Sequence, residues 1–130
     1  MSTFFVSLPT ADRARTHVFY SRGMGFETPG VPAEDGVPEP LVVAVDGQPV
    51  VMFIPTGGFG WVTGGRETAG PDTHEVLLSL AVRDAELVDV YMVRAANAGG
   101  TVVTPAGPQP WGYSGTFADP DGHLWQVTAL

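Results

Sequence analysis

Three histidines, His17, His74 and His123, are the side chains of this sequence best suited to metal binding or acid–base chemistry. His17 falls in an expected helix, His74 precedes an expected strand, and His123 follows an Asp-Pro-Asp-Gly turn. Their spacing matches no metal-binding motif. A histidine in such surroundings is more often a hydrogen-bonding residue of a surface or a turn. The glutamates and aspartates lie mostly in expected loops, where a solvated charge is the simpler interpretation.

Motifs for a nucleophile or a phosphate site are also missing from the sequence. It contains no cysteine, which excludes disulfides, thiolate catalysis and cysteine-bound metals. The segment Gly57-Gly58-Phe59-Gly60 lacks the Gly-Lys-Ser/Thr that completes a phosphate loop, and no Gly-x-Ser-x-Gly elbow occurs. We therefore predict no catalytic residue and no cofactor.

The composition indicates a single globular domain. A chain of 130 residues, 44% of them hydrophobic, can form a core without covalent or metal cross-links. Its formal charge of −8 repels a polyphosphate backbone, so we expect no nucleic-acid partner. The apolar runs are shorter than the roughly 20 residues of a membrane-spanning helix, and no signal peptide is evident. A cytoplasmic location without membrane contact is expected.

The two halves of the sequence resemble each other. Residues 4–8 align with residues 76–80, and Asp12 aligns with Asp84. In each half an apolar strand precedes a helix, expected at about residues 12–22 and 84–98. The two aspartates suit helix N-termini, where a carboxylate accepts unpaired N–H groups. Gly23 and Gly99 suit the C-terminal ends.

Short apolar strands follow each helix. In the first half they are expected at residues 26–28, 41–45 and 50–54, with a hairpin turn at Asp46-Gly47. In the second half they are expected at residues 101–104, 113–118 and 124–128. The chain is thus interpreted as two βαβββ modules, about residues 1–56 and 74–130. Residues 57–73 form either a linker between the modules or a flap over a ligand.

The most informative segment runs from Trp111 to Val127, in which two apolar strands are joined at the turn Asp119-Pro120-Asp121-Gly122. This segment resembles the C-terminal signature of the vicinal oxygen chelate superfamily, which contains glyoxalases, bleomycin-resistance proteins and extradiol dioxygenases. Leu8-Pro9 with Asp12 and Gly99-Gly100 extend the resemblance over nearly the whole chain. It implies an α+β fold in which two βαβββ modules form a curved mixed sheet around a cup.

The resemblance also implies where a divalent metal would bind in metal-dependent relatives. Carried over by position, the four ligand places hold hydrocarbon side chains and one amide: Phe5, Phe53, Leu77 and Gln126. Metals of this kind need oxygen and imidazole donors. We therefore expect no metal at the family position.

Strand alternation then predicts the lining of the cup. If the four ligand places face it, Ser7, Val51, Ser79, Leu124 and Thr128 do as well. Met52, Ile54, Trp125 and Val127 would then face the helices. Trp61, Trp111 and Tyr113 lie in or beside loops, where they can stack on a planar ligand. The predicted ligand-binding residues are Phe5, Ser7, Phe53, Trp61, Leu77, Ser79, Trp111, Tyr113 and Gln126. The alternative is that these side chains simply close a core.

Two functions follow from this interpretation. The first is a non-catalytic binding protein of the bleomycin-resistance type, which sequesters a small aromatic or heterocyclic drug or antibiotic in an aromatic-lined cup. The resemblance implies a homodimer for such a protein. The alternative is a glyoxalase- or dioxygenase-type enzyme, a lyase or oxidoreductase with a non-standard or absent metal site.

Overall fold

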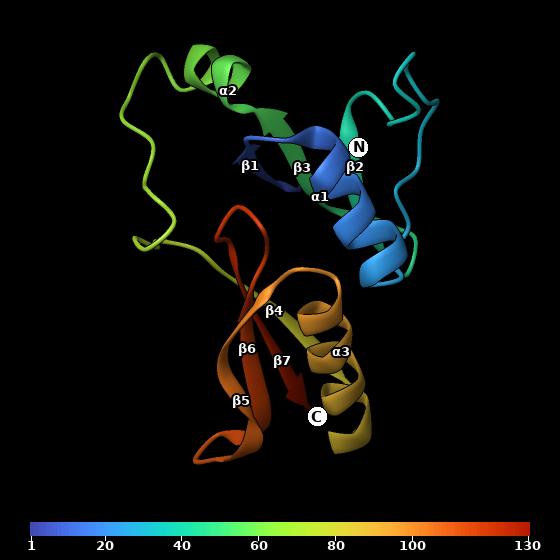
Figure 1. Cartoon of the computed structure of the whole chain (residues 1–130), viewed down its shortest axis with the longest axis vertical. Helices are drawn as coiled ribbons and strands as arrows, with labels where there is room; N and C mark the ends of the chain where they lie inside the picture. Colours follow the sequence, from blue (N-terminus) through green and yellow to red (C-terminus); the bar gives the residue numbers. More distant parts are fainter. The chain divides into compact units, whose positions relative to one another are not determined.

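The computed structural model describes all residues from Met1 to Leu130. They form two compact units, Met1–Thr68 and Ala69–Leu130 (Figure 1). Each unit has its own sheet and its own helix packed against that sheet.

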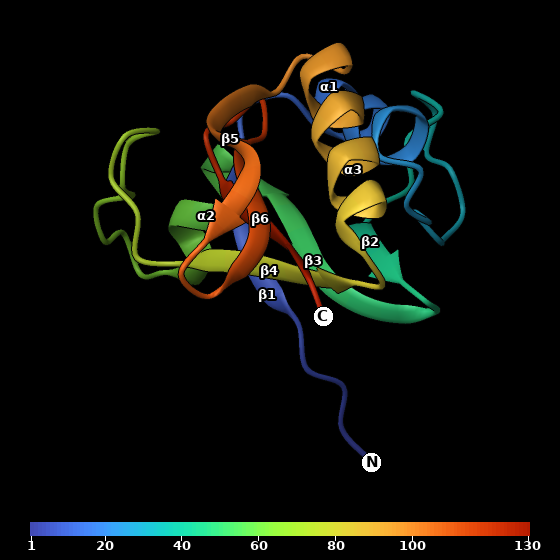
Figure 2. The same ribbon diagram turned by 90° about the horizontal axis from the view of Figure 1, so that it is seen from below.

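Three strands form the sheet of the first unit: β1 (Val6–Thr10), β2 (Leu41–Val45) and β3 (Gln48–Pro55). Their order is β1-β3-β2, with β1 parallel and β2 antiparallel to β3. At the turn between β2 and β3, Asp46 and Gly47 have φ values of 50° and 78°. Two consecutive positive φ values are typical of a type I′ hairpin, so the hairpin predicted from the sequence is confirmed. The residues before β1 extend away from this sheet (Figure 2).

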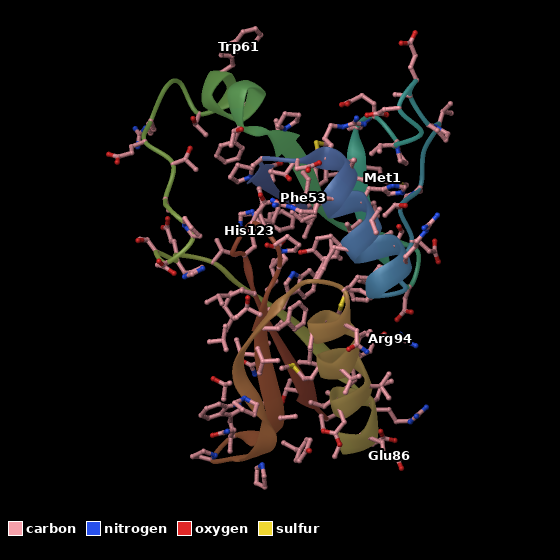
Figure 3. All side chains as sticks on the ribbon, in the orientation of Figure 1. Met1, Phe53, Trp61, Glu86, Arg94 and His123 are labelled. Carbon is pink, nitrogen blue, oxygen red and sulfur yellow. The ribbon has the colours of Figure 1, made fainter.

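The helical segment after β1 consists of α1 (Arg13–Val18) and the π-helical turn η1 (Phe19–Gly23). It covers the predicted residues, and Asp12 caps it by accepting a hydrogen bond from the Arg15 amide at 3.1 Å. Tyr20 of η1 stacks on Phe53 of β3 with ring centroids 5.0 Å apart, and both side chains are buried. Figure 3 shows Phe53 on the strand side of this helical segment. One face of the first sheet is therefore a packed aromatic core.

Two segments of the first unit differ from the prediction. The strand expected at residues 26–28 is reduced to a single bridge between Glu27 and Ala44. Prolines crowd the segment that follows, and proline has no N–H to continue a strand ladder. The segment expected at residues 57–73 to be a linker or a flap begins instead within helix α2 (Thr56–Val62). Its Gly58 lies so close to Ile54 that an added Cβ would be 3.4 Å from the Ile54 side chain.

Four strands form the sheet of the second unit: β4 (Leu77–Val82), β5 (Thr101–Gln109), β6 (Gly112–Ala118) and β7 (Leu124–Ala129). Their order is β4-β7-β6-β5, and β4 runs parallel to β7 while β6 runs antiparallel to β5 and β7. Helix α3 (Ala85–Asn97) packs along this sheet (Figures 1 and 2). Asp84 caps it by accepting a hydrogen bond from the Leu87 amide at 3.0 Å. Strands and helix agree with the predicted βαβββ module.

The core of the second unit lies between α3 and one face of the sheet. Phe117 and Trp125 stack with ring centroids 6.2 Å apart, and both are buried. Gly115 of β6 lies so close to α3 that an added Cβ would be 2.9 Å from Met92. A larger residue at this position would therefore force the Met92 side chain to move, so glycine here allows α3 to pack closely on β6. The α+β fold class is confirmed, with two sheets of mixed strands in place of one.

Candidate functional site

The side of the second sheet opposite α3 is the candidate site, and we call it the open face. Side chains along β4 alternate between the two faces of the sheet. Leu78 and Leu80 pair with the core residues Trp125 and Val127 of β7, so they lie on the α3 side. The residues between them point the other way. The open face consists of Leu77, Ser79, Ala81, Ser114, Thr116, Ala118, Leu124, Gln126 and Thr128.

A polar row crosses the middle of the open face. Ser79 of β4 pairs with Gln126 of β7, which in turn pairs with Thr116 of β6. Neighbouring strands are about 4.8 Å apart, so the row spans roughly 10 Å. None of the side-chain hydrogen bonds within the second unit involves these three residues. The row therefore presents hydroxyl and amide groups that no protein group satisfies.

Apolar and aromatic groups flank this polar row. On one side Leu77 pairs with Leu124, and Leu77 remains 49% exposed. On the other side, beyond Ser114, lies Trp111 of the β5–β6 hairpin, whose Nε1 donates a hydrogen bond to Ser114 Oγ at 3.0 Å. Trp111 remains 65% exposed. A polar row between apolar and aromatic borders is the usual make-up of a small-molecule site.

In the second unit the strand register agrees with the predicted faces of the strands, except that it places one predicted residue, Tyr113, on the opposite face. Leu77, Ser79 and Gln126 lie on the open face as the alternation predicted. Tyr113 instead lies on the α3 side, because its hydroxyl donates a hydrogen bond to Asp89 Oδ1 of α3 at 2.6 Å. That bond raises the pKa of Tyr113 above its ordinary value. Thr116 was missed, although its position next to the core residue Phe117 could have indicated it.

In the first unit the predicted face of β3 is wrong by one residue. Phe53 and Val51 are buried, and Phe53 packs under Tyr20, so neither faces away from the helices. Ser7 pairs with Met52, which places Met52 and Ser7 together on the other face of the first sheet. An uninterrupted apolar run such as Val50 to Ile54 gives no alternation from which to choose the face.

Two further predicted residues, Phe5 and Trp61, lie outside the strands. Phe5 immediately precedes β1 and is half-buried, whereas Trp61 extends from α2 and is 90% exposed (Figure 3). Trp61 therefore has the exposure that stacking on a ligand requires. Its role and that of Phe5 stay predictions.

The residues at the family's metal positions do not fit a divalent ion. Ser7 pairs with Met52 in the first sheet just as Ser79 pairs with Gln126 in the second. The four places are therefore held by Phe5, Met52, Leu77 and Gln126. Two hydrocarbons, one thioether and one neutral amide lack the carboxylate and imidazole donors that such ions prefer. We derive no chemical step through a metal at this position.

A separate group of possible donors lies at the turn between β6 and β7. Asp119, Asp121 and His123 place their ligand atoms within 4.8 Å of one another, and Figure 3 shows His123 at this turn. The buried Asp119 already accepts hydrogen bonds from the amides of Asp121 and His123, at 3.0 and 2.8 Å. His74 closes over the turn through a 2.6 Å contact between Nε2 and the Gly122 carbonyl. These bonds explain Asp119 as part of the structure of the turn.

Comparison with known families identifies the class of this protein. Residues 4–127 match the model of the Glyoxalase/Bleomycin resistance protein/Dioxygenase superfamily. The chain therefore belongs to this superfamily, as the signature from Trp111 to Val127 predicted. None of the curated proteins matches the sequence.

Solved structures share the fold over nearly the whole chain. A hypothetical protein from S. aureus superposes with a TM-score of 0.84 at 24% identity, covering 100% of this chain and 95% of its own. A glyoxalase-related enzyme from Fulvimarina pelagi has a TM-score of 0.82 at 25% identity, with coverage of 99% and 88%. TnmS3, an antibiotic binding protein from Streptomyces sp. CB03234, has a TM-score of 0.66 at 23% identity, with coverage of 99% and 95%.

No helix of this chain combines the length and the apolar character needed to cross a membrane.

Proposed function

We propose that this chain is a non-catalytic protein that binds and sequesters a small aromatic or heterocyclic molecule, such as a drug or an antibiotic. The observation that carries the proposal is the replacement of the metal donors by Leu77 and Gln126 on a face that keeps unsatisfied polar groups. Such a face can hold and orient a ligand. It offers no nucleophile and no base positioned to alter it.

The chemistry of the open face supports this proposal. Leu77 and Leu124 provide apolar surface that a planar ligand can cover, while Ser79, Gln126 and Thr116 provide a few directed hydrogen bonds. Trp111, held by Ser114, provides an exposed ring at one border. The antibiotic-binding relative TnmS3 shows that the superfamily fold is compatible with such a role.

An enzyme of the glyoxalase or dioxygenase type, a lyase or oxidoreductase, is the second candidate. It is favoured by the grouping of Asp119, Asp121 and His123, which could hold a metal displaced from the family position. The relative from Fulvimarina pelagi is described as a glyoxalase-related enzyme. In the form with a displaced metal site, this candidate requires that the protein bind a divalent ion tightly.

A thermal-shift screen of the purified chain against divalent metals and aromatic antibiotics separates the two candidates. A ligand that binds the folded state alone stabilises it by mass action, by about 2.7 kcal/mol at a concentration 100 times its Kd. We expect at least one planar aromatic compound to raise the melting temperature in the presence of a chelator. Stabilisation by a metal alone, abolished by the chelator, would support the enzyme instead.

A further inference from the structure

The chemistry of the polar row on the open face allows the ligand class to be narrowed. Ser79 and Thr116 each present a hydroxyl, which can donate and accept, and Gln126 presents an amide with two donor hydrogens and one acceptor oxygen. All three lie in one line across β4, β7 and β6. A rigid ligand with oxygens on its edge can meet this line of donors.

The absence of charged side chains on the open face also narrows the class of ligand. No residue of the open face is ionisable. The two arginines of the second unit lie elsewhere: Arg83 pairs with Asp84 at 2.8 Å, and Arg94 lies over the ring of Tyr91 on α3 at 5.5 Å. An anionic ligand would find no counter-ion here, on a chain whose formal charge is −8. Burying an unpaired charge is costly.

We infer that the open face binds an uncharged aromatic carbonyl compound, a quinone or a planar amide, with its carbonyl oxygens on Ser79, Gln126 and Thr116. This inference rests on the proposed function and gives it a ligand class. The carbonyl oxygens accept from the polar row, and the ring system covers Leu77 and Leu124.

Calorimetric titration with 1,4-naphthoquinone and with 1,4-naphthoquinone-2-sulfonate tests the inference. The pair differs by one negative charge on the same ring system. The chain has no cysteine, the side chain most reactive toward quinones, and an unchanged protein mass after the titration shows that the signal reports reversible binding. We expect the neutral quinone to bind at least fivefold more tightly than the sulfonate. Equal or tighter binding of the sulfonate would overturn the inference, while the proposed function would stand.

A charge-matched pair of variants tests the role of Gln126. Gln126→Glu keeps the shape of the side chain but replaces its N–H donors by a carboxylate oxygen, so affinity for the neutral quinone should fall by about fivefold to tenfold. Gln48→Glu adds the same charge at an exposed position of the first unit and should leave affinity unchanged. Unchanged affinity in Gln126→Glu, or no binding of either quinone by the parent chain, would also overturn the inference. Failure of the proposed function is judged separately, by a screen in which no aromatic compound stabilises the chain.

Discussion

The indole N–H of Trp111 donates a hydrogen bond to the hydroxyl of Ser114 at 3.0 Å, although the tryptophan is 65% exposed and the serine only 3%. The serine lies on β6 within the open face, so the bond ties an exposed surface ring to a paired strand. An aromatic side chain that is held at one edge and exposed on its ring faces is pre-organised for stacking.

Removing this ring should weaken ligand binding. Stacking on an aromatic side chain contributes about 0.5–1.5 kcal/mol beyond area burial, so Trp111→Ala should raise Kd by roughly twofold to tenfold. Ser114→Ala should have a smaller effect in the same direction, because the ring stays but loses its anchor. Calorimetry with the compound found by thermal shift measures both. Unchanged affinity in Trp111→Ala would show that Trp111 does not contact the ligand.

Removing the other tryptophan of the second unit, Trp125, should lower the stability of the fold. Trp125 is buried against Phe117, and deleting a core tryptophan costs about 3–5 kcal/mol. Urea unfolding of Trp125→Ala should show this loss. Trp61→Ala provides the matched control, since an exposed tryptophan on α2 should change stability by no more than about 0.5 kcal/mol. Similar unfolding midpoints for the two variants would contradict the division between core and surface.

Acid should weaken the start of α3 through Asp84. The Arg83 guanidinium beside it, and then the Leu87 amide, hold the pKa of the Asp84 carboxyl below its usual value. A lowered folded-state pKa stabilises the fold above the unfolded pKa, and this stabilisation is lost as pH falls through the folded value. Asp84→Asn keeps a capping oxygen but loses the charge. Its urea midpoint should therefore lie below that of the parent at neutral pH, and the difference should vanish in strong acid. Asp72→Asn removes the same charge at an exposed position and should leave the urea midpoint at neutral pH unchanged.

We expect the chain to associate as a homodimer, since closed two-fold pairing is the commonest form of homo-oligomer. Light scattering at micromolar concentration should give about twice the monomer mass of 13.7 kDa. A mass equal to the monomer across the accessible concentration range would contradict this expectation.

Much of the fold could be predicted because its local signals were strong. Asp12 and Asp84 marked both helix starts, and Asp46-Gly47 marked the hairpin. In β7 the alternation of Trp125 and Val127 with Gln126 and Thr128 placed Gln126 on the open face, and strand pairing agrees with that alternation.

The remaining positions were decided by packing that the sequence does not display. The run from Val50 to Ile54 is apolar throughout, so only its pairing with β1 and the contact of Phe53 with Tyr20 select the buried face. Tyr113, by contrast, could have been placed from the sequence, because alternation along β6 puts it on the α3 side with Phe117, where its hydroxyl bonds to Asp89. Helix α2 forms in a glycine-rich segment whose propensity disfavours it, with Gly58 close to Ile54.

Chemical recovery of the bound compound tests most directly whether the chain binds its ligand without changing it. Tag-free protein would be incubated with the aromatic compound that stabilises it, with and without added manganese or zinc, and the extract analysed by mass spectrometry. The proposed function predicts full recovery of a compound of unchanged mass under both conditions. Product formed beyond one equivalent per chain, and suppressed by a chelator, would contradict sequestration and establish an enzyme.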